Sequence, residues 1–229
     1  MREIVLDTET TGLDPNNGDR IVEIGAVELI GHMPTGKTYH QYINPERTMP
    51  KEAFEVHGLG DEFLADKPVF RQIAQDFVDF IGDTILVIHN AAFDMKFLNA
   101  ELTRAGFAPL PWEQAIDTLA IARKKFPGAQ ASLDSLCRRF GIDNSNRTLH
   151  GALLDSEILA EVYLELIGGR QPDLVLGESQ ASSASVMSSH WRAQPRAKKL
   201  PQRLTPQEAK AHAAFVETLG EDALWHKFS

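Results

Sequence analysis

Two kinds of hydrophobic pattern alternate along the first 169 residues. Short apolar, mostly β-branched runs at 4–6 and 84–88 are typical of strands buried on both faces. Partial alternation over 20–30 and 37–43 predicts two more strands, joined by a turn within 31–36. Because a short turn favours antiparallel pairing, we expect the first three strands to form an antiparallel meander.

Apolar residues spaced three and four apart predict amphipathic helices between and after these strands. The clearest runs over 69–81, and a proline opens a short helix before it. Asp117 is placed to cap one later helix, and Cys137 to be buried in another. The other predicted helices are 51–57, a helix after strand 84–88 with Phe93, Phe97, Leu98 and Leu102 on its apolar face, and 118–125, 132–140 and 152–167.

Strands followed by helices indicate an α/β fold, with a mixed sheet of a three-stranded antiparallel meander plus parallel strands, flanked by helices.

The composition changes after residue 169. Residues 178–204 are rich in Ser, Ala, Gln and Pro with few large apolar side chains, which predicts a flexible linker. Thr205-Pro206-Gln207-Glu208 then has the pattern of a capping box and opens a short helix that ends near Leu219.

Charge is unevenly distributed. Residues 1–169 carry 15 Lys and Arg against 26 Asp and Glu, whereas residues 170–229 carry 8 against 6. Such an acidic body argues against broad electrostatic capture of nucleic acid, although local contact through metal ions remains compatible with it. A single cysteine and no membrane-length apolar run indicate a protein without disulfides in a reducing cytoplasm, with no membrane partner.

Four carboxylates stand out because they fall where the pattern predicts burial. Asp7 and Glu9 follow the first strand, and residues two apart in a strand point to the same face. Asp94 shares the apolar side of its helix, and Asp155 shares the apolar stripe of helix 152–167. His150, five residues before Asp155, is placed on the preceding loop, because five helical steps would turn it away.

Clustered carboxylates need compensating charge, because two unit charges ~4 Å apart repel by about 4 kcal/mol at an effective dielectric of 20. No matching set of Lys or Arg accompanies these acids in the sequence. Oxygen-rich sites of this kind suit Mg²⁺ or Mn²⁺, and two such ions clamp the attacking and leaving oxygens of a phosphodiester. The sequence therefore predicts a site for two divalent ions.

Three motifs carry a resemblance to a known family. They are Asp7-x-Glu9, His89-Asn90-x-x-x-Asp94 and His150-x-x-x-x-Asp155. With them, residues 1–169 resemble the DnaQ-like superfamily of 3′→5′ exonucleases, in its Asp-Glu-Asp-Asp-His branch, which has a ribonuclease-H-like fold. Two further matches support the resemblance, Val56-His57-Gly58 and the stretch Ser132-Leu133-Asp134-Ser135-Leu136-Cys137.

The resemblance implies a role for each matching residue. Asp7, Glu9, Asp94 and Asp155 would hold the metals, with Asp7 bridging both. His150 would be the general base that takes a proton from the attacking water. The terminal nucleotide would be bound by five residues, namely Glu9 at the 3′-OH, Thr10 through its backbone, Leu13 as a wedge between bases, and Glu52 and His57 as pocket walls. For His57, a helix C-terminal histidine favoured by the dipole remains an equal alternative.

Within this superfamily the resemblance is closest to proofreading subunits of bacterial replicative polymerases. It implies a single-stranded DNA 3′ end as substrate and four segments, namely an exonuclease domain (1–169), a sliding-clamp motif (170–177), a linker (178–204) and a polymerase-binding helix (205–229). The expected tail contacts are Gln171, Leu174 and Leu176 for the clamp, and Phe215 and Trp225 for the polymerase subunit. Whether a small accessory subunit also binds is left open.

Two alternatives remain at this stage. The first is a stand-alone exoribonuclease of the ribonuclease T or oligoribonuclease type, which the tail of residues 170–229 disfavours. The second is a catalytically silent scaffold that joins clamp and polymerase, which the five filled catalytic positions disfavour.

Overall fold

A mixed five-stranded sheet forms the centre of the computed structural model, which describes residues 1–145, 149–169 and 204–219. The strand order is β3-β2-β1-β4-β5. The first three strands are antiparallel neighbours, and β4 and β5 continue the sheet in parallel with β1. The predicted meander and mixed sheet are thus confirmed. The strands are β1 (Arg2–Thr10), β2 (Ile21–Ile30), β3 (Met33–Tyr42), β4 (Ile85–Ile88) and β5 (Ala115–Asp117).

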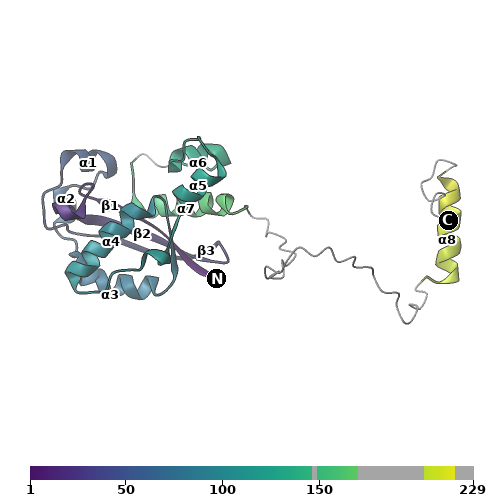
Figure 1. The fold of residues 1–229 in the computed structure, drawn as a ribbon, viewed down its shortest axis with the longest axis horizontal. Coiled ribbons are helices and arrows are strands. Elements are labelled where there is room, and N and C mark those ends of the chain that lie inside the picture. The colour runs from purple at the N-terminus through teal and green to yellow at the C-terminus, as the bar shows by residue number, and fades with distance from the viewer. Residues whose placement is uncertain (146–148, 170–203, 220–229) are drawn as a thin grey trace, which may run out of the picture. The chain divides into compact units, whose positions relative to one another are not determined.

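Helices cover both faces of this sheet (Figure 1). The helices of residues 1–169 are α1 (Lys51–His57), α2 (Asp61–Leu64), α3 (Phe70–Ile81), α4 (Ala91–Ala105), α5 (Thr118–Lys125), α6 (Leu133–Phe140) and α7 (Ala152–Leu166), with two 3₁₀ turns, η1 (Pro15–Asn17) and η2 (Trp112–Gln114). The structure differs from the predictions in two places. The β2–β3 turn is only Gly31-His32, so β3 begins at Met33, and α2 was not predicted.

Strand alternation divides the core between the two faces. On one face Ile4 and Leu6 pack against α3 and α4, in a cluster that includes Phe77 and Phe97. On the other face Val5 packs against α7, and α5 and α6 pack in turn on the outer side of α7. The site residues of β1, Asp7 and Glu9, have the same parity as Val5, so they point toward the α7 face.

Local sequence signals fix several of the helix ends as predicted. Asp117 accepts a hydrogen bond from the Leu119 amide at 2.9 Å and so caps α5. Cys137 is fully buried in α6. In the tail, α8 (Pro206–Thr218) opens with a reciprocal capping box between Thr205 and Glu208.

The chain divides into two compact units, residues 1–175 and 176–229, and each is described by itself. Phe215 on α8 is exposed. The proposed clamp contacts Gln171, Leu174 and Leu176, and the anchor Trp225, lie outside the described residues. Among the described residues, no helix is both long and apolar enough to span a membrane.

Candidate active site

The five residues singled out in the sequence line one cavity of about 210 Å³ at the end of β1. They come from four different parts of the chain, and the sheet order explains their meeting, since β1 is central and β4 lies beside it. Side chains that follow adjacent strands converge at one sheet edge. The five are Asp7, Glu9, Asp94, His150 and Asp155.

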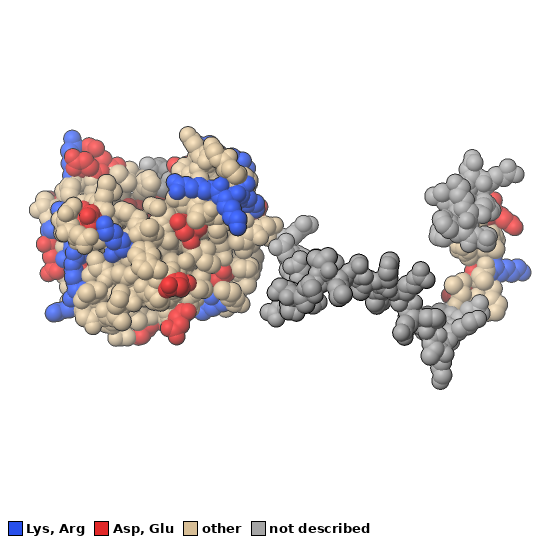
Figure 2. Space-filling view, in the orientation of Figure 1, with Lys and Arg blue, Asp and Glu red and all other residues tan. Residues whose placement is uncertain are grey.

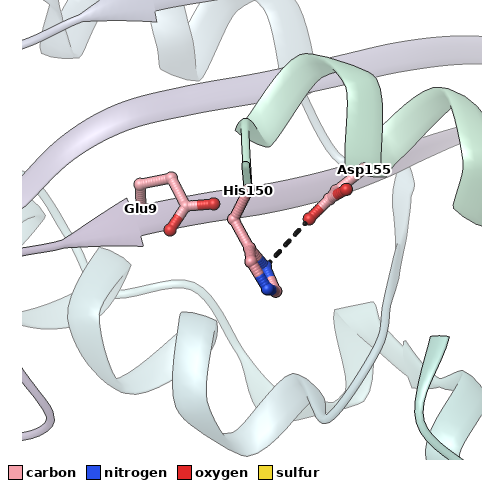
Figure 3. Close-up of side chains that lie close together, drawn as sticks. All are labelled: Glu9, His150 and Asp155. Carbon is pink, nitrogen blue, oxygen red and sulfur yellow. Dashed lines mark ion pairs between the residues drawn. The ribbon is translucent and has the colours of Figure 1, made fainter. Parts of the chain in front are cut away.

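Three of these side chains lie in close contact. Glu9, His150 and Asp155 each offer an atom within 4.8 Å of the others' (Figure 3). The Nδ1 atom of His150 lies 3.3 Å from Oδ2 of Asp155, although His150 sits on the loop and Asp155 on the first turn of α7. Glu9 and Asp155 are buried, whereas the His150 side chain is half exposed. The histidine therefore stands between buried carboxylates and solvent.

Asp94 has a separate environment on the first turn of α4, where it is almost completely buried. Its Oδ1 accepts a hydrogen bond of 2.7 Å from the hydroxyl of Thr8. Burial raises the pKa of Asp94 to about 7, and the Thr8 hydrogen bond opposes that rise. A carboxylate whose charge is this costly in the protein alone is well suited to bind a cation.

The donor set fits hard divalent cations. The cavity lining includes four carboxylates, and no Lys or Arg is among its described residues. Oxygen-rich sites with a single imidazole favour Mg²⁺ or Mn²⁺ over Zn²⁺.

A second cavity, of about 520 Å³, adjoins the first and shares Thr8, Glu9 and Phe93 with it. Its volume is in the range of small-ligand pockets. It is lined by every residue predicted to bind the terminal nucleotide. Those residues are Glu9, Thr10, Leu13, Glu52 and His57. Leu13 is 81% exposed, so its apolar side chain is available at this pocket instead of being packed in the hydrophobic core.

His57 is buried at the end of α1, and its ring orientation is defined. Its Nδ1 accepts a hydrogen bond from the Leu59 amide at 3.0 Å, so Nε2 carries the proton of the neutral ring. Nε2 is buried and has no hydrogen-bond partner among the described residues. Burial lowers the pKa of His57, and a polar contact with the Thr10 backbone, which does not meet hydrogen-bond geometry, partly opposes that change. The neutral ring favours the pocket role of His57 over the alternative of a charged histidine at the helix dipole.

His89 and Asn90 shape the turn that precedes α4. Asn90 adopts a left-handed conformation (φ 65°), and its amide donates to Asp117 at 3.0 Å. The Nδ1 atom of His89 lies 2.9 Å from the Thr118 hydroxyl. Both residues also line the acidic cavity, so the turn before α4 forms part of the site.

Sequence reasoning missed two residues of the site. Thr8 alternates with Asp7 and Glu9 along β1, and its position between two acids was the available signal. Phe93 lines both cavities, whereas its helical spacing placed it among core residues.

Comparison with known proteins places this geometry in a family. The family model described as Exonuclease (RNase T) matches residues 4–163. DNA polymerase III subunit epsilon of Rickettsia felis is 48% identical over 222 residues, which cover 96% of this chain and 97% of that protein. The Escherichia coli protein of the same name is 45% identical over 235 residues, covering 98% and 97%.

Solved structures agree with the fold. Exonuclease X, solved in complex with 5′ overhanging duplex DNA, is 26% identical with a TM-score of 0.57, over 72% of this chain and 90% of that one. The nuclease domain of 3′hExo, a DEDDh family member bound to rAMP, has a TM-score of 0.63 at 21% identity, over 72% and 91%.

Proposed function

The chain belongs to the exonuclease family, and from that premise we propose a role in hydrolysis for the residues around its two cavities. The chain is a proofreading 3′→5′ DNA exonuclease. One observation carries the proposal for the site: the acidic cavity with its histidine adjoins a pocket that offers apolar contacts.

We assign Asp7, Glu9, Asp94 and Asp155 to holding two divalent ions, Mg²⁺ or Mn²⁺. When bound, these ions supply positive charge against the phosphodiester oxygens and orient the reacting groups. The protein contributes the fixed positions of the four carboxylates, two on β1 and one on the first turn of each of α4 and α7. Three of them, Glu9, Asp94 and Asp155, are buried.

His150 is assigned to accept a proton from the attacking water. Its contact with Asp155 through Nδ1, at 3.3 Å, orients the ring. Nε2 is then the atom that takes the proton. Because the side chain is half exposed, the proton can pass to solvent after each turnover.

The second cavity is assigned to the terminal nucleotide. Leu13 lies against a base, and Nε2 of His57, a buried donor that makes no well-formed hydrogen bond within the described residues, donates to an oxygen of the nucleotide. A buried polar group left unpaired costs about 1–3 kcal/mol, so a hydrogen bond formed only with substrate favours binding. The Thr10 hydroxyl donates to the Gly12 carbonyl at 2.6 Å, which holds the turn beneath the nucleotide.

The wider assembly follows from the relatives' names. The chain associates with DNA polymerase III. We assign contact with the polymerase subunit to α8 and Trp225, and contact with a sliding clamp to Gln171, Leu174 and Leu176, on sequence pattern alone. We assign the chain to the cytoplasm, as the location that corresponds to this assembly.

The experiment that tests this function compares three substrates of one sequence, namely single-stranded DNA, duplex DNA with a mismatched 3′ end, and single-stranded RNA. We expect nucleoside 5′-monophosphates to be released stepwise from both DNA substrates. Faster release from RNA than from either DNA would favour the exoribonuclease alternative. Absence of hydrolysis on all three substrates, with either metal, would favour the silent scaffold.

A further inference from the structure

Basic side chains gather on α5 and α6 although the body of the protein is acidic. Residues 118–142 hold five of the 15 Lys and Arg of residues 1–169, together with a single acid. All five cations are exposed, and Figure 2 shows blue side chains grouped over the part of the surface that Figure 1 labels α5 and α6. The five are Arg123, Lys124, Lys125, Arg138 and Arg139.

Helix geometry explains part of this group. The cations occupy the last turns of α5 and α6, where positive charge is worth about 0.3–1 kcal/mol against the helix dipole. Lys125 also donates to the backbone carbonyls at the end of α7, and Arg139 lies 4.4 Å over the ring of Phe126. Those two residues therefore have structural roles.

The other three cations have fewer interactions with the described residues of the protein. Arg123 and Lys124 make no hydrogen bond or ion pair with any residue that the structure describes. Within the described part of the chain, Arg138 donates only to the hydroxyl of Ser135, at 3.0 Å. Their charges are available to a ligand.

Arg138 lies on a path that leads away from the catalytic site. It lines a cavity of about 520 Å³ that reaches from α6 to α1, and His150 lines the same cavity. His150 also lines the acidic cavity, so the two spaces meet at the proposed general base. Two acids, Glu55 and Asp134, line this cavity as well, and Asp134 accepts a hydrogen bond from Asn144 at 3.0 Å.

Arg123 approaches the site from α5. The helix starts beside the site, because its cap Asp117 binds the Asn90 amide and its first residue Thr118 contacts His89. Burial is the main cause of the lowered pKa of His89, and the positive charge of Arg123 adds to it. At 1.5 Å per residue, the eight residues of α5 span about 12 Å, so Arg123 and Lys124 lie within that distance of the end of α5 that adjoins the site.

We propose that Arg123, Lys124 and Arg138 bind phosphates of the substrate strand upstream of the hydrolysed bond. This inference rests on the proposed function and extends it to the part of the strand outside the terminal pocket. With about 3.4 Å between nucleotides along a stacked strand, 12 Å corresponds to three or four nucleotides. Phosphates are the ligand that fits, because guanidinium groups bind them through two parallel hydrogen bonds and the function supplies a polyanion here.

The proposal resolves an electrostatic problem. The acidic body repels DNA overall, yet the strand must stay in place while its end is hydrolysed. A few cations near the exit of the site hold the strand without making the whole surface attractive to nucleic acid.

The test uses the full chain and two double variants with the same loss of charge. Arg123→Ala with Arg138→Ala removes the proposed contacts, and Lys37→Ala with Arg71→Ala removes two exposed cations from β3 and α3. Each protein is assayed on a 20-nucleotide single strand and on the p-nitrophenyl ester of thymidine 5′-monophosphate, which is one nucleotide long.

We expect KM for the 20-mer to rise about 5- to 20-fold in the first variant with kcat unchanged. Its salt dependence, as the slope of log KM against log salt concentration, should fall by about 1.4, or about 0.7 for each lost phosphate contact. Turnover of the ester should equal wild type, as should every property of the control variant.

Equal KM values for the 20-mer in the two variants would overturn the proposal, as would a parallel loss on the ester, since the cations would then support the site itself. Binding of an acidic protein partner instead of DNA would leave the 20-mer kinetics at wild type and so give the same refutation. If wild type hydrolyses neither substrate, the proposed function fails, which is a separate result.

Discussion

The hydroxyl of Ser156 donates a hydrogen bond of 2.9 Å to the backbone carbonyl of Gly25, 131 residues earlier in the chain. Gly25 lies directly opposite Asp7 in the β1–β2 register, and Ser156 follows Asp155. A Cβ atom at Gly25 would overlap backbone atoms of Ala152 and Leu153. The first turn of α7 is thus in contact with β2 at a glycine, which brings the carboxylates of Asp7 and Asp155 into one cavity.

This contact predicts that Gly25→Ala damages the site and the fold together. Added volume in a packed interior typically costs about 1–3 kcal/mol, and here it would displace α7 from the sheet. We expect a lower free energy of unfolding in denaturant titration and weaker Mn²⁺ binding in calorimetry. Gly60→Ala is the control, because its Cβ would meet only the side chain of Phe54. Wild-type Mn²⁺ affinity in Gly25→Ala would contradict the assigned role.

His150→Ala should separate chemistry from binding. Loss of a general base lowers rates by about 10²–10⁴-fold, while the four carboxylates remain. Single-turnover hydrolysis of single-stranded DNA should slow by that factor, and fluorescence anisotropy should show unchanged DNA binding. Asp155→Asn is the comparison and should also weaken Mn²⁺ binding. A wild-type rate in His150→Ala would leave the histidine as a loop residue only.

The raised pKa of Asp94 predicts how stability depends on pH in the absence of metal. Between the ordinary value of 3.8 and the folded value of about 7, the unfolded chain loses the proton that the folded chain retains. The stabilisation is therefore complete below pH 4 and is lost as pH rises to 7, by up to about 4 kcal/mol at 1.36 kcal/mol per unit.

Asp94→Asn removes this titration. In excess chelator we expect its melting temperature to exceed that of wild type at pH 8, with a smaller difference at pH 5. The Thr8 hydroxyl can still donate to the amide oxygen of the variant. Equal pH dependence of the melting temperature in both proteins would show that Asp94 does not titrate in this range.

The tail predicts a division between catalysis and assembly. At 13 residues, α8 is at the length where isolated helices are marginal in water, so docking on a partner would stabilise it. Deleting residues 205–229 should leave hydrolysis of free single strands at the wild-type rate and abolish co-purification with the polymerase subunit. Undiminished co-purification would place the contact elsewhere.

Local patterns sufficed for much of the fold. Period and capping signals located α3, α5 and α7 to within a residue or two, because each follows from neighbours in sequence. The sequence places the β2–β3 turn too broadly because glycines at both 31 and 36 are turn signals, and only pairing with β2 decides between them. The four residues of α2 are too few to show a helical period.

In the site, too, some residues follow from local sequence patterns and others do not. Asp94 and Asp155 were visible because a carboxylate interrupts an apolar stripe, and His150 because a helix could not hold it beside Asp155. The contacts of Thr8 with Asp94 and of Ser156 with Gly25 join residues 86 and 131 positions apart. No local pattern encodes such pairs, since the register of the sheet and the position of α7 on it create them.

The central claim is that the carboxylates around one cavity carry out metal-dependent hydrolysis from the 3′ end. The most direct measurement is the rate of terminal nucleotide release from a 5′-labelled single strand, titrated with Mg²⁺ from excess chelator, for wild type and Asp7→Asn. We predict no release in chelator, a saturable rise with Mg²⁺ for wild type, and at most residual release for Asp7→Asn at any Mg²⁺ concentration. Full release in chelator, or a wild-type rate in Asp7→Asn, would contradict the account.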